Sequence, residues 1–129
     1  MILVDSSVWI DFFNGRQSRE TDLLNELLST EPLLMGDLIL TEVLQGFRHD
    51  KDYRKVKAEL EKLAFAPMVG QGISIKSAEN YRRLRKQGIT VRKTIDVLIA
   101  TFCIENNHTL LHSDRDFDVM IDVLGLQIL

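Results

Sequence analysis

Four acidic residues that are far apart in the sequence lie within or just after apolar segments: Asp5, Glu42, Asp96 and Asp114. A carboxylate on an otherwise buried element is costly unless another group pairs with it. If the fold brings the four together, their mutual repulsion must be relieved by protons or by a cation. We therefore expect these acids to form a cation site.

The ligand types indicate which cation this would be. The expected set contains only carboxylates, without a pair of histidines or cysteines. Such hard oxygen ligands suit Mg²⁺ or Mn²⁺ rather than Zn²⁺. Mg²⁺ in proteins commonly takes one or two carboxylates together with a substrate phosphate, so the predicted chemistry is metal-assisted hydrolysis of a phosphodiester.

Each acid also has a simpler explanation. Asp5 and Asp114 could cap the helices that follow them, Asp96 could complement a helix dipole, and Glu42 could be a solvated residue of an amphipathic helix. Capping requires one oxygen at a helix start, however, and it does not account for a glutamate in the middle of a helix. The four acids taken together favour a shared site.

The hydrophobic pattern predicts the elements that position these acids. Short apolar runs alternate with longer amphipathic segments, which is typical of an α/β sandwich around a mainly parallel sheet. Asp5 and Asp114 follow expected strands, and ligands of parallel sheets bind beyond the carboxyl ends of the strands. We expect Ser6 or Ser7, Asp37 and Thr94 to cap helices. The expected strands are residues 2–4, 33–35, 109–112 and 126–129, and the expected helices are residues 8–13, 21–28, 37–47, 50–63, 75–86, 95–104 and 115–123.

Length and composition are those of an ordinary globular protein. The chain has 129 residues, of which 45% are hydrophobic and 27% charged, and no linker-like segment divides it, so we expect a single domain covering residues 1–129. Its one cysteine, Cys103, cannot form an internal disulfide, and no apolar run is long enough to span a bilayer. We expect a cytoplasmic protein with no membrane partner.

Four segments carry the acids: residues 1–11 (MILVDSSVWID), 41–46 (TEVLQG), 88–100 (GITVRKTIDVLIA) and 110–118 (LLHSDRDFD). In this order they resemble the motifs of PIN-domain ribonuclease toxins of the VapC type, and the resemblance covers nearly the whole chain. It implies a PIN-like three-layer α/β/α sandwich. It also implies a Mg²⁺-dependent endoribonuclease, the toxin of a type II toxin–antitoxin system, which cleaves structured RNA such as tRNA or rRNA.

The resemblance implies roles for particular residues. Asp5, Glu42, Asp96 and Asp114 would form the catalytic metal site, with Asp5 and Asp96 as direct ligands. Asp116 matches a second acid of the closing motif, either a ligand or a partner of one. The hydroxyls of Ser6 and Ser113 would orient a carboxylate or a water. The family further implies a homodimer, and a VapB-type antitoxin whose C-terminal segment covers the catalytic groove.

A net charge of −3 gives the chain no general attraction for RNA, so local basic residues must contact the phosphates. Arg92 and Lys93 directly precede the segment that carries Asp96, and we expect them to bind RNA. The run of basic residues at positions 82–86 is as consistent with a solvated helix face as with an RNA contact.

Two other classes of protein remain to be considered. An aspartate phosphotransfer domain also places aspartates at strand ends, but the dehalogenase type has a second Asp two residues after the first, where this chain has Ser7. A non-catalytic PIN-like domain that binds RNA or a protein partner would have lost some of its acids, whereas this chain keeps all four. Metal-dependent cleavage of RNA separates the nuclease from both alternatives.

Overall fold

Four short strands form one parallel sheet at the centre of the computed structural model, which describes residues 1–129. Leu3 in the middle of β1 pairs with Leu34 on one side and with Leu110 on the other. All three strand pairings are parallel, which confirms the predicted kind of sheet. In the order in which they lie across the sheet, the strands are β3 (Ala64–Ala66), β2 (Leu33–Gly36), β1 (Ile2–Val4) and β4 (Thr109–Leu111).

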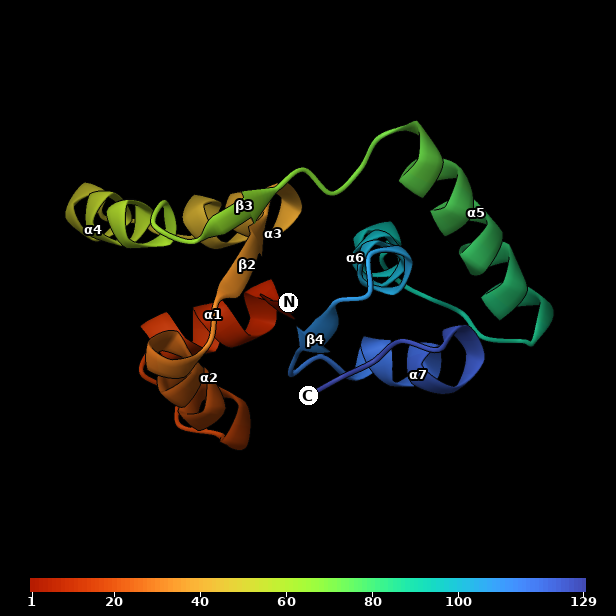
Figure 1. The fold of residues 1–129 in the computed structure, drawn as a ribbon, viewed down its shortest axis with the longest axis horizontal. Coiled ribbons are helices and arrows are strands. Elements are labelled where there is room, and N and C mark those ends of the chain that lie inside the picture. Colours follow the sequence, from red (N-terminus) through yellow and green to blue (C-terminus); the bar gives the residue numbers. More distant parts are fainter.

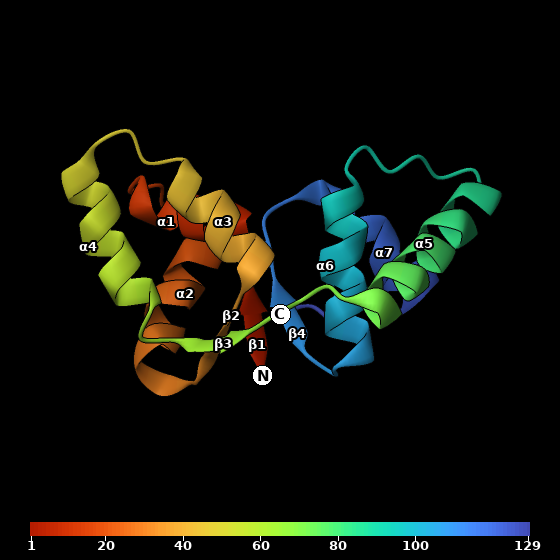
Figure 2. The same ribbon diagram turned by 90° about the horizontal axis from the view of Figure 1, so that it is seen from above.

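Helices cover the sheet on both sides (Figures 1 and 2). Figure 2 shows α1 to α4 on one side of the strands and α5 to α7 on the other, which confirms the α/β/α arrangement. The first group comprises α1 (Ser6–Phe13), α2 (Arg19–Thr30), α3 (Asp37–Gln45) and α4 (Asp50–Leu60). The second comprises α5 (Gln71–Lys86), α6 (Thr94–Glu105) and α7 (Asp118–Leu124), with the 3₁₀ helix η1 (Arg115–Phe117) before α7.

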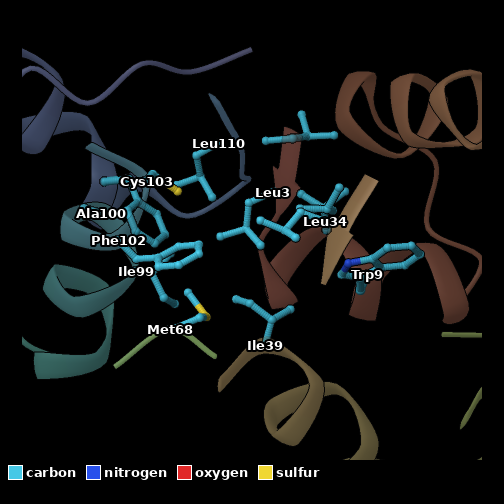
Figure 3. Packing of buried hydrophobic residues seen from close by; sticks show 14 of the residues in the cluster. Leu3, Trp9, Leu34, Ile39, Met68, Ile99, Ala100, Phe102, Cys103 and Leu110 are labelled. Atoms are coloured by element: carbon cyan, nitrogen blue, oxygen red, sulfur yellow. The ribbon is translucent and has the colours of Figure 1, made fainter. Parts of the chain in front are cut away.

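The strands β1 and β2, together with the last two residues of β4, are apolar or lack a polar side chain because helices cover both of their faces. Leu3, Leu110 and Leu111 are completely buried. Figure 3 shows Leu3 lying between Leu34 and Leu110. The helix α6 is apolar nearly all round because it packs against α5, β4 and η1 together. A single hydrophobic cluster draws residues from both groups of helices, while the single domain expected over residues 1–129 stays a prediction.

The sequence did not predict β3. Its three residues are apolar, but they are exposed or only partly buried, and the strand is placed by pairing with β2. The strand expected at 126–129 is wrong, since only an isolated bridge joins Leu110 and Ile128. The helix expected at 115–123 is divided into η1 and α7.

The helix caps were predicted only in part: Asp5 and Asp114 cap the elements that follow them, which was one interpretation of the sequence, but the other expected caps differ. Asp5, rather than Ser6 or Ser7, is the N-cap of α1, and its side chain accepts a hydrogen bond from the backbone N–H of Ser7. Asp37 and Thr94 are the first residues of α3 and α6 instead of their caps. The cap of α3 is a glycine, which has no side chain to donate or accept.

The chain passes closely over the end of β2 on its way to α5. A Cβ at Gly36 would overlap Sδ of Met68, which is buried, so a larger residue at the end of β2 would require the Met68 side chain to move. Oδ1 of Asp37 accepts hydrogen bonds from the N–H groups of Leu38 at 2.8 Å and Met68 at 3.1 Å. These contacts fix the segment that follows β3 beside the start of α3. Among the helices, none combines the length and the apolar character that crossing a membrane requires.

Candidate metal centre

The carboxyl ends of β1 and β4 bring two of the predicted acids to one edge of the sheet. These strands are direct neighbours, with Val4 opposite Leu111. The backbone N–H of Asp5 donates to the carbonyl of Leu111 at 2.9 Å, so the chain is still paired where Asp5 begins. Asp114 follows β4 after two intervening residues. The N-terminal turn of α6 carries Asp96 to the same edge, as expected for a ligand site of a parallel sheet.

Three carboxylates form the tightest group. One oxygen from each of Asp96, Asp114 and Asp116 lies within 4.8 Å of the other two. Asp96 is 4% exposed, and its Oδ2 is buried without a hydrogen-bond partner. A buried carboxylate oxygen without a partner is costly, and a cation beside it would remove that cost. This orphaned oxygen is the observation that fits a metal ion best.

The side chain of Asp5 is held by Ser7. Oδ2 of Asp5 accepts hydrogen bonds from the Ser7 N–H at 3.1 Å and from the Ser7 hydroxyl at 2.6 Å. The Ser7 hydroxyl in turn accepts from the backbone N–H of Ser113 at 3.2 Å. Ser7 therefore links the opening and closing motifs, and the sequence analysis missed it. The signal was its position two residues after Asp5, where an N-capping aspartate is expected to bind.

The Ser6 side chain contacts one of the predicted acids. Its hydroxyl donates to Oε1 of Glu42 at 3.1 Å, so the start of α1 is bonded to the middle of α3. Glu42 is half-buried and close enough to Asp5 for the two charges to interact. Ser113 acts through its backbone, and its exposed side chain makes no hydrogen bond to a carboxylate.

Burial and like charges raise several pKa values at this edge. Burial raises the pKa of Asp96 to about 6, with further contributions from Asp114, Asp5 and Asp116, while Lys93 opposes the shift. Burial also raises the pKa of Asp5, against the hydrogen bonds from Ser7. The pKa of Glu42 is raised chiefly by burial, and Asp5 adds to the shift. The carboxylates thus repel one another as the sequence analysis expected.

The two predicted RNA-binding residues face the acids. Nζ of Lys93 lies 3.4 Å from Asp114, and a guanidinium nitrogen of Arg92 lies 3.2 and 3.3 Å from the two oxygens of Asp116. The nearby acids, Asp96 first, raise the pKa of Lys93. Both cationic side chains are more than half exposed, so these ion pairs are weak and exchangeable. Neither of them pairs with the buried Asp96 oxygen.

His112 is the histidine nearest to the acids. Its ring lies 5.0 Å from the Phe117 ring, and its charge tends to lower the pKa of Asp5. It is not part of the tight group, which consists of aspartates only. A set of carboxylate oxygens without imidazole suits Mg²⁺ or Mn²⁺ rather than Zn²⁺.

The structure thus brings together all five acids named from the sequence, but it groups them differently. Asp116 belongs to the tight group, whereas Asp5 stands beside it, with one oxygen already bonded to Ser7. Asp116 is turned back toward Asp114 because its N–H donates to Oδ1 of Asp114 at 2.9 Å. Such a group can bind a divalent ion at the end of the sheet and present it to a phosphate.

Comparison with known proteins identifies both a protein family and related proteins with known names. The PIN domain model matches residues 2–122. The chain is 32% identical over 130 residues to Ribonuclease VapC11 of Mycobacterium tuberculosis, an alignment that covers 98% of this chain and 96% of that protein.

Two solved structures share the fold. One is VapBC2 from Rickettsia felis bound to a DNA fragment from their promoter, with a TM-score of 0.77 and 17% identity, covering 100% of this chain and 98% of that chain. The other is Mycobacterium tuberculosis VapC20, described as a Sarcin-Ricin loop cleaving toxin, with a TM-score of 0.66 and 15% identity, covering 92% of this chain and 94% of that chain.

Proposed function

Because the chain belongs to the PIN domain family, as a VapC-type ribonuclease toxin, we propose that it is a Mg²⁺-dependent endoribonuclease that cleaves structured RNA. The buried, unpartnered oxygen of Asp96 within a group of three aspartates is the observation that carries the metal dependence. A bound Mg²⁺ would activate water and stabilise the charge that develops on the scissile phosphate, and Mn²⁺ would serve in the same way.

The residues around the group have distinct proposed roles. Asp96, Asp114 and Asp116 hold the ion, since their oxygens lie close enough together to share it. Asp5 and Glu42 complete the acidic site, and the hydrogen bonds from Ser7 and Ser6 fix the orientation of their carboxylates. Fixed orientation matters because a displacement of about 1 Å can cost a hundred-fold in rate.

Arg92 and Lys93 are proposed to exchange partners when RNA binds. They now neutralise Asp116 and Asp114, which a metal ion would neutralise instead. Their exposed side chains are then free to contact phosphates beside the site. The name of VapC20, whose fold this chain shares, is consistent with ribosomal RNA as the class of substrate, with tRNA as the other candidate.

The test is cleavage of tRNA and of ribosomal RNA by the purified protein, in Mg²⁺ and in EDTA. We expect discrete RNA fragments in Mg²⁺, none in EDTA, and recovery of cleavage when Mg²⁺ is restored. Sequencing of the new RNA ends would identify the target. Cleavage that persists in EDTA would contradict the metal mechanism, and no cleavage under any condition would favour a non-catalytic RNA- or partner-binding domain.

We propose a VapB-type antitoxin as the protein partner, which is consistent with the VapBC2 complex that shares this fold. An apolar cavity of about 390 Å³ between α1, α2 and α4 offers an anchoring surface. Trp9, Phe12 and Phe13 line it with Leu28, which is 41% exposed. An apolar residue of the antitoxin would fill this cavity while its neighbouring segment covers the acids.

Leu28→Glu is expected to weaken binding of the cognate antitoxin by about ten-fold or more, because it places a charge in an apolar cavity. Val119→Glu is the matched control, since Val119 is 37% exposed on α7, on the other side of the sheet. Isothermal titration calorimetry measures both affinities. Equal affinities for the two variants would exclude this cavity as the anchor. The homodimer stays a prediction, which sedimentation velocity can check.

A further inference from the structure

A second, open groove adjoins the acidic site, and several of its lining residues, Arg16 and Arg115 among them, have no role in the mechanism described so far. It has a volume of about 410 Å³ and runs between α1 with its following loop on one side and the start of η1 on the other. Asp114 lies in its wall, so the groove begins at the proposed metal site. Ser7 and Ser113, which join the two motifs, also line it.

Three arginines line this groove, and two of them lack a strong partner. The Arg115 side chain makes no hydrogen bond or ion pair, and its residue is exposed. Arg16 has a side chain that is 72% exposed, and its nearest carboxylate, Asp11, is 3.9 Å away. The third, Arg92, contacts Asp116. Arg16 and Arg115 come from opposite walls, so anions that enter the groove meet a guanidinium on each side.

The groove also has an apolar side chain in its wall. Ile10 on α1 is 39% exposed there, although the other exposed positions of the groove are polar. Guanidinium groups bind phosphates through paired hydrogen bonds, and an apolar side chain can pack against a ribose or a base. This combination matches a nucleic acid strand better than an acidic polypeptide. In a nucleic acid each phosphate is followed by a ribose and a base, against which an apolar side chain can pack, whereas a uniformly acidic polypeptide has no such group.

We propose that this groove holds the RNA strand that leads away from the cleaved bond. Arg16 and Arg115 bind backbone phosphates next to the scissile one, and Ile10 contacts the intervening nucleotide. The proposal rests on the proposed ribonuclease function. An RNA strand whose scissile phosphate lies at the proposed metal site has to continue into a neighbouring space, and this groove opens directly from Asp114 of that site. With a net charge of −3 the chain has no general attraction for RNA, so such local contacts set the affinity.

The experiment compares binding of a short fluorescein-labelled single-stranded RNA by fluorescence anisotropy in EDTA, at several salt concentrations. The variant Arg16→Ala/Arg115→Ala removes both proposed phosphate contacts. We expect its affinity to fall by about ten-fold or more at low salt. The slope of log K against log salt should become shallower by about 1.4, because each phosphate contact to a single strand contributes about 0.7.

Two further variants test whether positive charge at these two positions, rather than the net charge of the protein, sets the affinity for RNA. Arg16→Lys/Arg115→Lys keeps both positive charges and is expected to restore the salt slope. Lys51→Ala/Arg54→Ala, on the exposed face of α4, removes the same total charge away from the groove and should bind RNA as the unaltered protein does. If the Arg16/Arg115 alanine variant binds RNA as well as this control does, the proposal is overturned.

Poly-glutamate provides the third arm of the experiment. If the alanine variant loses affinity for poly-glutamate but keeps its affinity for RNA, the groove binds an acidic polypeptide, and the RNA assignment is overturned. Failure of the ribonuclease function itself has a different signature, since it appears in the unaltered protein as absence of Mg²⁺-dependent cleavage. A protein that cleaves RNA normally while the groove variant binds and cleaves like the control would remove the groove proposal alone.

Discussion

Replacement of Asp96 by Asn is expected to lower the rate of RNA cleavage in Mg²⁺ by about a thousand-fold or more. The change keeps the shape of the side chain and removes its charge. Asp96 is buried, its Oδ2 has no hydrogen-bond partner, and one of its oxygens lies within 4.8 Å of an oxygen of Asp114 and of Asp116, so we expect no neighbouring group to replace it as a ligand. The measurement is the single-turnover rate on the RNA that the protein cleaves.

Glu105→Gln is the matched control for this variant. Glu105 is an exposed acid at the opposite end of the same helix, α6, so its replacement also removes one negative charge. Its cleavage rate should stay within about two-fold of that of the unaltered protein, since surface changes of this kind have little effect. An Asp96→Asn variant as active as the control would remove Asp96 from the mechanism.

A second large effect is expected on stability. Because burial raises the pKa of Asp96 to about 6 in the folded protein, its protonated form favours folding, and ionisation opposes it. This contribution is complete below the unfolded pKa of 3.8 and is lost as pH rises through about 6. In EDTA the ionised acid should therefore cost roughly 1–3 kcal/mol of folding free energy at pH 8 relative to pH 4.

Mg²⁺ should reverse that loss at pH 8. A ligand at about one hundred times its dissociation constant stabilises the folded state by about 2.7 kcal/mol, which for a protein of this size raises Tm by about 5–10 °C. Thermal unfolding followed by circular dichroism measures the shift. In Asp96→Asn the pH-dependent loss should be smaller and the Mg²⁺ shift should nearly disappear. An undiminished Mg²⁺ shift in this variant would place the ion elsewhere.

The location of the acids could be predicted from the sequence because it follows from two strong signals. The runs 2–4 and 110–111 are apolar, which indicated buried strands, and Asp5 follows the first run directly while Asp114 follows the second after two residues. Parallel strands then place both acids at one edge, with no need to know any side-chain contact. By contrast, β3 is a segment of only three apolar residues, two of them exposed, and it is placed by its pairing with β2 rather than by burial.

The grouping of the acids could not be predicted because it depends on short hydrogen bonds. The Ser7 hydroxyl donates a hydrogen bond of 2.6 Å to Oδ2 of Asp5, which keeps this oxygen directed toward the start of α1. The 3₁₀ turn after Asp114 folds Asp116 back beside it, whereas an α-helix had been expected there. Spacing in the sequence shows which acids reach the site, but these local bonds decide which of them can share one ion.

The two edges of the sheet differ in one respect that limits self-association. At β4, the last residues of the chain bond to Leu110, whose N–H donates to the carbonyl of Gln127 and whose carbonyl accepts from the N–H of Leu129. That edge is occupied, while β3 has a neighbouring strand on one side only. A molecule with one vacant strand edge can pair with a second copy through that edge, so pairing between sheet edges favours an assembly of two copies over an extended fibre.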